Sequence, residues 1–297
     1  MLNDLNLSAY AILYNAILRF FKTFNYFKRH IFTIMNTKHQ TLLDYVPSEG
    51  LLKDKVILVT GAGAGIGRAI ALAYARFGAT VVLLGKKLKE LENVYDEIES
   101  AGYPEPAIYP LNMEGANAKD YQDMADVFEE KLGGLDGIAL NAAWLPGYIP
   151  FKEYEVELWL KTITVNLHAN FLISKACLPL LEKSSDPSII FSSHASTQAY
   201  NGAFGVAKAG ALAMIDILGQ EYDNPDNFIR VNSIDTGPVR TQMRKMNYPG
   251  EDIESLVRPE ALVGPYLFFM GEDAAKQTNE KITFDRIAAD FKWVGEA

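Results

Sequence analysis

From residue 55 onward the chain alternates two patterns of hydrophobic positions. Short apolar runs rich in β-branched residues alternate with longer segments whose apolar residues recur at helical spacing. The short runs predict strands at 55–60, 80–84, 107–111, 137–140, 188–192, 229–234 and 281–284, and the longer segments predict helices at 65–77, 88–101, 118–131, 155–182 and 203–221. Continuously apolar strands are typical of a parallel sheet that is buried on both faces. We therefore predict an α/β fold: a single doubly wound domain, with a parallel seven-stranded sheet and helices on both faces.

Composition and charge narrow the class of protein. Of the 297 residues, 49% are hydrophobic and 22% are charged, which is enough apolar material for a sizeable core. The net charge of -9 disfavours nucleic acid as a partner. The single cysteine excludes an internal disulfide framework, and the four histidines (His30, His39, His168, His194) lack zinc-ligand spacing. We expect a cytoplasmic protein without a metal ion or a nucleic acid partner.

The first forty residues differ from the rest of the chain. They hold five basic residues and one acidic residue, and their apolar run at 9–21 is shorter than the ~20 residues of a spanning helix. No basic segment precedes that run, as a signal peptide would require. Two alternatives stay open: residues 1–34 are an interfacial amphipathic anchor, or translation starts at Met35. We predict that residues 1–47 are an extension outside the fold and that the domain occupies 48–297.

A glycine-rich turn follows the first predicted strand directly. The stretch TGAGAGIG places Gly61, Gly65 and Gly67 between that strand and the next helix. Small residues there let the backbone approach a pyrophosphate, and the N–H groups and positive end of the helix face its charge. The alternative is a bare tight turn. The position between strand and helix favours dinucleotide binding.

The end of the second predicted strand indicates which dinucleotide is bound. An acidic residue there would bind the ribose 2′-hydroxyl of NAD, but the chain reads LLGKK, with Gly85 at that position and Lys86 and Lys87 next. Two cations suit a 2′-phosphate, so the sequence favours NADP(H) over NAD(H). The alternative is two solvated lysines at a helix start.

Taken together, these motifs resemble the short-chain dehydrogenase/reductase family, with a match that covers 51–285. The similarity rests on the turn at 60–67, the LNAA motif around Asn141, Asn166 in VNLHANF, Lys208 in GAFGVAK, and Thr236-Gly237 followed by Thr241. The segment GPYLFFMGEDAAKQTNEKITFD is most similar to the YciK-type bacterial oxidoreductases within that family. The resemblance implies a Rossmann fold.

The resemblance also implies roles for single residues. A family member would contact its coenzyme through the residues that correspond here to Thr60, Gly61, Gly65, Ile66, Gly67, Lys86, Lys87, Asn112, Asn141, Lys208, Gly237 and Thr241. Asn112 replaces the aspartate with which the family contacts adenine. Asn166 and Lys208 correspond to the asparagine and lysine that support the family's proton transfer.

The family's catalytic tyrosine is replaced. Phe204 stands four residues before Lys208, where the tyrosine is expected, and a phenyl ring can donate no proton. Counting from the preceding strand puts His194 at the position of the family's serine, whereas counting back from Phe204 puts Ser192 or Ser193 there. We favour His194, because a strand fixes register better than a loop.

Two functions follow from this replacement. In the first, the protein is an oxidoreductase with impaired or rerouted activity toward a small carbonyl or alcohol, and His194 or Tyr200 supplies the acid. In the second, it is an inactive NADP(H)-binding sensor or partner subunit. Retention of Asn166 and Lys208 favours the first function, and joint loss of the tyrosine and serine favours the second.

The remaining expectations concern substrate and assembly. Trp144, Tyr148 and Phe151 follow the fourth strand, where they would line an apolar or aromatic substrate site or pack a loop onto the sheet. The segment 241–256 is expected to form a flexible cover. The apolar helix at 203–221 and the helix before it correspond to the family's dimer face, which implies a homodimer or homotetramer.

Overall fold

The computed structural model describes residues 41–194, 197–284 and 287–293. The chain divides into two compact units, Met1–Leu42 and Leu43–Ala297, and the second unit contains the sheet. The proposed anchor at 1–34 and the alternative start at Met35 lie outside the described residues.

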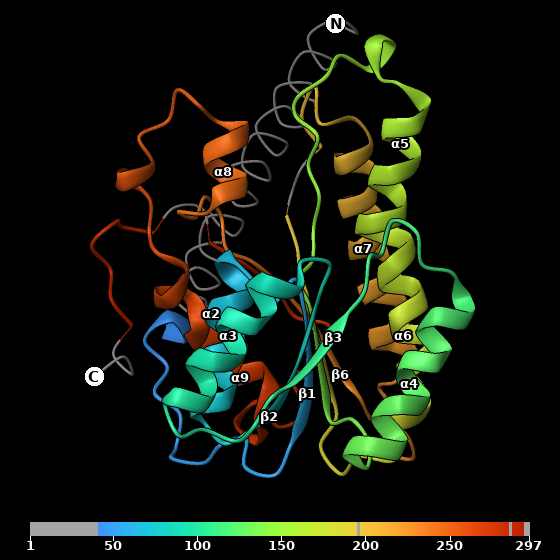
Figure 1. Ribbon diagram of the computed structural model, residues 1–297, viewed down its shortest axis with the longest axis vertical. Coiled ribbons are helices and arrows are strands. Elements are labelled where there is room, and N and C mark those ends of the chain that lie inside the picture. The colour runs from blue at the N-terminus through green and yellow to red at the C-terminus, as the bar shows by residue number, and fades with distance from the viewer. Residues whose placement is uncertain (1–40, 195–196, 285–286, 294–297) are drawn as a thin grey trace, which may run out of the picture. The chain divides into compact units, whose positions relative to one another are not determined.

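Seven strands form one sheet in the order β3-β2-β1-β4-β5-β6-β7, and every neighbouring pair is parallel. This confirms the predicted fold class (Figure 1). The strands are β1 (Val56–Thr60), β2 (Thr80–Gly85), β3 (Ala107–Pro110), β4 (Gly137–Leu140), β5 (Ser188–Ser192), β6 (Arg230–Asp235) and β7 (Lys281–Thr283). The order reverses between β1 and β4, and such a switch point opens a crevice at the carboxyl ends of the strands.

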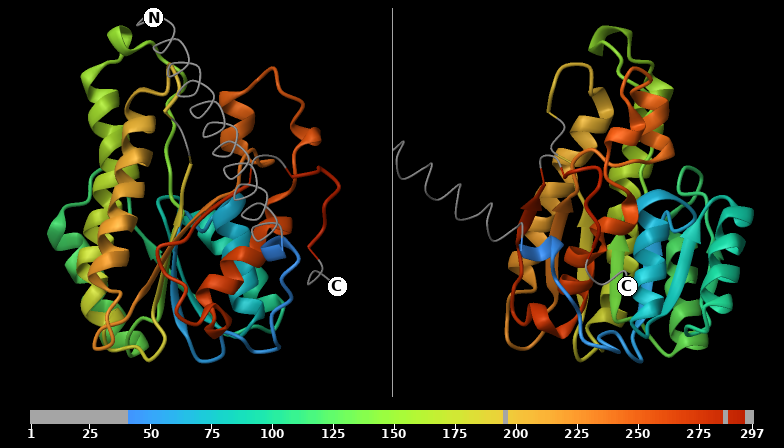
Figure 2. Two further views of the ribbon diagram at one scale, coloured as in Figure 1. Left: turned by 180° about the vertical axis from the view of Figure 1, so that it is seen from behind. Right: turned by 90° about the vertical axis from the view of Figure 1, so that its left-hand side faces the viewer.

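Helices cover both faces of this sheet, as Figures 1 and 2 show. One face carries α2 (Gly65–Arg76), α3 (Leu88–Ser100) and α9 (Val263–Met270), and the other carries α4 (Ala118–Leu132), α6 (Ala169–Leu181) and α7 (Gly202–Glu221). Side chains such as Phe128, Ile173 and Ile215 pack between the second layer of helices and the sheet. Burial of these apolar surfaces supplies the main driving force for the three-layer arrangement.

Two helical segments differ from the sequence prediction. The helix predicted at 155–182 consists of α5 (Val156–Ile163), a π-helical segment η2 (Thr164–His168) and α6. The helix α9 was not predicted, because seven of its eight residues are buried and it is apolar on all sides. Such a segment carries no helical alternation of polar and apolar positions.

Short helical elements complete the domain. The helix α8 (Gln242–Asn247) and the loop after β4 stand over the carboxyl edge of the sheet (Figure 2). The 3₁₀ turns are η1 (Phe151–Glu153), η3 (Ile253–Ser255), η4 (Pro259–Leu262) and η5 (Glu272–Ala274). Among the described helices, α7 alone has the length and apolar composition of a membrane span, and nine of its residues are buried within this domain.

Two residues that lie before position 48, Leu43 and Tyr45, belong to the second unit and pack within it. Leu43 is fully buried, the Tyr45 hydroxyl donates to Asp273, and the Trp293 Nε1 donates to the Tyr45 carbonyl at 2.8 Å. The compact unit therefore begins at Leu43, a few residues before the boundary drawn from the sequence.

Candidate functional site

Two adjoining pockets lie at the carboxyl edge of the sheet, beside the switch point. Pocket A has a volume of about 330 Å³ and contains Ser192, His194, Phe204 and Lys208 among its lining residues. Pocket B has a volume of about 290 Å³ and is lined by Gly85, Lys86, Lys87 and Asn112 among others. The two pockets share Gly61, Ala64, Ala142, Ala143 and Met243. They therefore form one groove, which runs across the ends of the central strands.

The glycine turn between β1 and α2 forms the wall common to both pockets. Gly61 has a φ of +67°, and a Cβ at Gly67 would lie 2.2 Å from the Gly61 carbonyl oxygen. The N-cap of α2 is Ala64, which offers no side-chain hydrogen bond to the first N–H groups of the helix. Backbone donors at the start of a helix attract phosphate groups. The turn thus fits the pyrophosphate of a dinucleotide.

Behind this turn, Thr60 braces the ends of β1 and β4. Thr60 is fully buried, and its hydroxyl oxygen accepts hydrogen bonds from the backbone N–H groups of Asn141 and Ala142, both at 2.9 Å. The Asn141 side chain donates to the Thr60 carbonyl at 3.3 Å and accepts from the Ser192 hydroxyl at 3.1 Å. These four residues form a brace that fixes the floor of the groove.

The predicted coenzyme contacts fall into three groups. Gly61, Gly65, Ile66, Asn141, Lys208, Gly237 and Thr241 line pocket A, and Lys86, Lys87 and Asn112 line pocket B. Thr60 and Gly67 line neither pocket, since Thr60 belongs to the brace and Gly67 packs against the turn. The Thr241 hydroxyl oxygen accepts from the Arg244 N–H at 3.2 Å and so also caps α8.

Charge in pocket B is partly compensated. Lys87 pairs with Glu90 at 2.6 Å, across one turn of α3. Lys86 is exposed and has no ion pair within the described part of the chain. The Asn112 side-chain oxygen accepts from the Glu114 N–H at 3.3 Å, which shapes the loop after β3.

Asn166 holds the loop after β4 in place. Its side-chain oxygen accepts from the Trp144 N–H at 2.9 Å, and its amide nitrogen donates to the carbonyls of Trp144 and Thr162, both at 2.8 Å. Asn166 lies in the π-helical segment η2. Its side chain is therefore hydrogen-bonded both to the preceding helical turn and to the loop after β4. Its side chain is buried and positions the backbone that lies between the two pockets.

Lys208 is the buried cation of pocket A. Its Nζ donates to the Ser192 carbonyl at 2.9 Å and lies 5.7 Å from the centre of the Phe204 ring. Burial lowers the pKa of Lys208 to about 8, with the nearby Asp235 carboxylate acting in the opposite direction. The ring of Phe204 is buried beside this amine and offers no proton.

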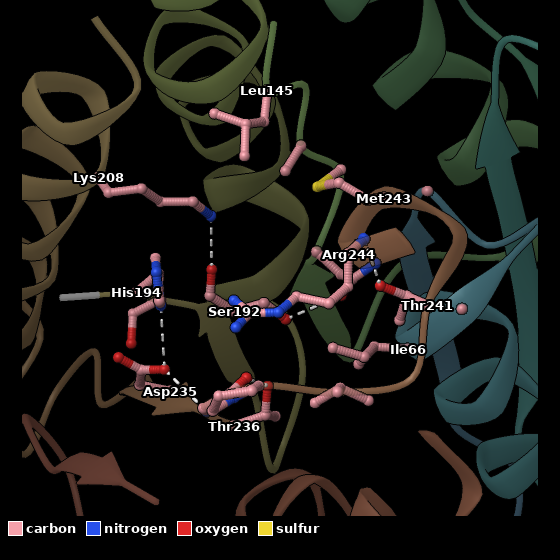
Figure 3. Close-up of a pocket in the computed structure, with 18 of the residues that line it drawn as sticks. Ile66, Leu145, Ser192, His194, Lys208, Asp235, Thr236, Thr241, Met243 and Arg244 are labelled. Carbon is pink, nitrogen blue, oxygen red and sulfur yellow. Dashed lines mark hydrogen bonds and ion pairs between the residues drawn. The ribbon is translucent and has the colours of Figure 1, made fainter. Parts of the chain in front are cut away.

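His194 enters the same pocket beside a carboxylate. Its Nδ1 lies 3.4 Å from Asp235 Oδ1, and its ring centre lies 6.4 Å from that of Phe204. Figure 3 shows the two side chains facing each other across the ends of β5 and β6. The sequence analysis missed Asp235, although a carboxylate at the carboxyl end of a parallel strand is a signal for a functional position.

The other candidates for the serine and acid positions are placed differently. The Ser192 hydroxyl lies 2.9 Å from that of Tyr266, a fully buried residue whose pKa is raised by burial. Ser193 lines pocket A, and its N–H donates to the Ile234 carbonyl at 2.9 Å. Tyr200 is 59% exposed, has a φ of +71° and does not line the described part of the pocket. Among these residues, His194 is the candidate acid that the structure brings into pocket A.

An aromatic clasp forms part of the wall of pocket A. We define it as Tyr148, Tyr248 and Arg244: the two hydroxyls are hydrogen-bonded, and the Arg244 guanidinium lies 3.3 Å from the centre of the Tyr248 ring. Glu251 binds Arg244 at 2.6 Å. The clasp joins the loop after β4 to the segment 241–256, which was predicted to be a cover.

Of the three aromatic residues predicted for the substrate site, Tyr148 alone lines pocket A. Trp144 lines pocket B, where Lys161 Nζ lies 4.5 Å from its ring centre, and Phe151 is 74% exposed. Leu145 and Met243 supply apolar surface that the sequence analysis missed (Figure 3). Within the described residues, no cluster of three His, Cys, Asp or Glu side chains could hold a metal ion.

Comparison with known proteins identifies the family. The short chain dehydrogenase family matches residues 55–252. The chain is 35% identical over 246 residues to the uncharacterized oxidoreductase YciK of Escherichia coli K12, a match covering 82% of this chain and 96% of that protein.

Solved structures give the same result. A short chain dehydrogenase from Pseudomonas syringae superposes with a TM-score of 0.78 at 39% identity, covering 81% of this chain and 98% of that one. One from Escherichia coli CFT073 in complex with NADPH has a TM-score of 0.76 at 35% identity, covering 80% of this chain and 99% of that one. The fold, the groove at the switch point and these matches show that the chain belongs to the short-chain dehydrogenase family, a family of oxidoreductases.

Proposed function

We propose that this protein binds NADP(H) in the groove and interconverts a small carbonyl compound and its alcohol, with His194 handling the proton. The observation that carries the proposal is the continuous groove, which joins an uncapped helix start to a pocket containing a buried lysine and a histidine. The related structure that contains NADPH supports the same coenzyme class.

The residues present fit each part of the coenzyme. The glycine turn would bind the pyrophosphate, pocket B would hold the adenosine end, and Lys86 and Lys87 would face the 2′-phosphate. Pocket A would hold the nicotinamide end beside Lys208, Gly237 and Thr241. The bound coenzyme supplies or accepts the hydride, and the protein orients the substrate and moves the proton.

The substrate pocket favours a compact, largely apolar carbonyl compound. Leu145, Met243 and Val239 provide apolar surface, while His194 and Lys208 bring polar groups to one side. Pockets of this kind bury most of a small ligand and orient it through a few polar groups.

A second candidate function has one observation in its favour. Phe204 is buried beside Lys208, and the amine is already hydrogen-bonded to the Ser192 carbonyl. A protein that binds NADP(H) without turnover, as a sensor or a partner subunit, would keep this arrangement.

A coenzyme titration tests the proposal. NADPH and NADH binding would be measured by fluorescence in the parent protein and in Lys86→Ala and Lys87→Ala. We expect NADPH to bind more tightly in the parent and about tenfold more weakly in either variant, which is about 1.4 kcal/mol. Lys89→Ala is the matched control, because Lys89 pairs with Glu92 just as Lys87 pairs with Glu90 but does not line the groove. Equal affinity for NADH and NADPH would contradict the coenzyme assignment.

A carbonyl panel then separates the two functions. NADPH oxidation by the parent that disappears in His194→Ala would support a rerouted oxidoreductase. Tight NADPH binding without turnover of any panel member would support the second candidate instead.

We also propose a homodimer or homotetramer. Phe171 on α6 and Val206 and Ile217 on α7 are about half exposed, at 46%, 47% and 54%. Exposed apolar side chains on helices that cover the same face of a sheet are compatible with a subunit interface there. Residues 1–34 are proposed to lie outside the fold, which a shortened chain starting at Met35 would test through unchanged thermal stability and NADPH affinity.

A further inference from the structure

We infer that Asp235 is a positioning residue for His194: it binds the Nδ1 side of the imidazole and leaves Nε2 directed into pocket A. This inference rests on the proposed function for its chemical purpose, but the geometry that carries it concerns the two side chains alone.

The sheet fixes the two residues side by side. The strands β5 and β6 are parallel neighbours with Ser192 opposite Ile234, and the Ser193 N–H continues the ladder to the Ile234 carbonyl at 2.9 Å. Asp235 ends β6 directly after Ile234, and His194 follows directly after Ser193. The register therefore brings both residues to the same edge of the sheet. His194 lies one position beyond the residue opposite Asp235 and past the end of β5, and there its Nδ1 meets the carboxylate.

The Asp235 carboxylate has a second hydrogen-bond partner besides His194, and this partner fixes its position. Its side chain is 9% exposed, and its Oδ1 accepts from the Gly237 N–H at 3.0 Å in the turn after β6. The same oxygen lies 3.4 Å from His194 Nδ1. A carboxylate can only accept, so Nδ1 must carry the hydrogen in this contact. The hydrogen on Nδ1 leaves Nε2 as the nitrogen that can exchange a proton with a ligand.

Asp235 is the one carboxylate among the described residues that line pocket A. The titratable and charged groups that line the described part of the pocket are Asp235, Lys208, Tyr148, Arg244 and Tyr248. Arg244 is compensated by Glu251, and Lys208 feels the same Asp235 carboxylate. Within that described lining, Asp235 is thus the carboxylate that can stabilise a protonated imidazole, and the His194 side chain is 38% exposed.

This arrangement supplies the proton that Phe204 cannot. As the carbonyl carbon of the substrate gains a hydride from the reduced coenzyme, the carbonyl oxygen takes the proton from Nε2 and becomes a hydroxyl. The imidazole is left neutral and regains its proton from water. In the oxidative direction, Nε2 accepts the hydroxyl proton as the hydride leaves.

The first measurement determines the tautomer of His194 directly. Nitrogen-15 NMR of the full chain at alkaline pH distinguishes the Nδ1–H and Nε2–H tautomers of neutral histidine, and the His194 signal is assigned by its loss in His194→Gln. We expect His194 to be mainly Nδ1–H in the parent and to shift toward Nε2–H in Asp235→Ala. Asp235→Asn keeps a neutral acceptor and should retain the Nδ1–H tautomer.

Kinetics provide the second measurement. Asp235→Ala should lower kcat at saturating NADPH about 10- to 100-fold. Because the Asp235 carboxylate also accepts from the Gly237 N–H, the NADPH dissociation constant is measured in the same variants to separate an effect on the turn from an effect on His194. Asp235→Asn should recover part of the lost kcat.

The two proposals fail separately. An unchanged His194 tautomer in Asp235→Ala would overturn the positioning role, whatever the activity. A shifted tautomer in a protein that turns over no carbonyl compound would support the positioning role and overturn the proposed catalytic function.

Discussion

At the scale of single residues, Lys208 links the site to the stability of the fold. Burial holds its pKa at about 8 in the folded protein, against an ordinary value of 10.5. Below pH 8 the amine is charged in both the folded and unfolded chain, and the cost of burying that charge is fully present. Between pH 8 and 10.5 the unfolded chain keeps a proton that the folded chain releases, so this group makes stability rise with pH.

Lys208→Met should abolish this rise. The free energy of unfolding of the parent, relative to that of the variant, should increase by up to about 3 kcal/mol between pH 8 and 10.5, from ~1.4 kcal/mol per pKa unit. Urea unfolding of both proteins at several pH values measures the difference, and the buried tyrosines cancel in the comparison. Parallel stability curves for the two proteins would show that the amine is not desolvated.

The variant Phe204→Tyr tests whether a hydroxyl at this position can donate the proton. Phe204→Tyr places a hydroxyl next to the Lys208 amine, whose Nζ is 5.7 Å from the ring centre. Because a positioned acid contributes ~10²–10⁴-fold, we expect carbonyl reduction to rise about 100-fold in this variant. NADPH oxidation measures the change. Phe204→Leu is the control, since it fills the site without a hydroxyl, and an equal gain there would rule out proton donation as the cause.

Some site residues could be located from the sequence, and others required the structure. Lys208, His194 and Phe204 could be located by motif, because their spacing along one strand and one helix is local. Asp235 could not be connected to His194 without knowing that β5 and β6 are neighbours in this register. Thr60 was expected to contact the coenzyme, but its side chain turns to the adjacent strand and binds the backbone of Asn141 and Ala142.

At the scale of elements, the aromatic clasp joins two segments that the chain separates widely. The rings of Tyr148 and Tyr248 meet edge to face with centres 5.2 Å apart. The segment 241–256 was predicted from its composition to be a flexible cover, whereas its contact with the loop after β4 could not be anticipated. The π-helical segment could not be predicted from the sequence either. Asn166 in this segment binds the loop through tertiary hydrogen bonds, which a local sequence pattern does not reveal.

Loss of the clasp should loosen the groove. In Tyr248→Ala we expect NADPH to dissociate about fivefold faster, because an aromatic pair contributes ~0.5–1.5 kcal/mol beyond burial and its loss frees the cover. Stopped-flow displacement measures the rate. Met246→Ala is the control, since Met246 is 71% exposed on the same helix α8. Equal rates in the parent and Tyr248→Ala would show that the clasp does not restrain the cover.

At the scale of the whole domain, the parallel sheet was predictable because seven apolar runs with helices between them permit few other arrangements. The oligomeric state, in contrast, cannot be read from a single chain. If α6 and α7 form the subunit interface, Ile217→Glu should lower the mass measured by sedimentation velocity to that of a smaller oligomer or monomer. Val127→Glu on α4 is the matched control, because Val127 is 40% exposed on another helix. A parent protein that is monomeric at all concentrations would contradict the proposed assembly.

The brace beneath the groove has an evolutionary consequence. Thr60, Asn141, Ala142 and Ser192 hold the strand ends with hydrogen bonds that involve neither His194 nor Phe204. Substitutions at the proton-handling positions can therefore accumulate without disturbing the frame that receives the coenzyme. Such separation would let descendants of one scaffold change in reaction chemistry while the architecture that receives the coenzyme is kept.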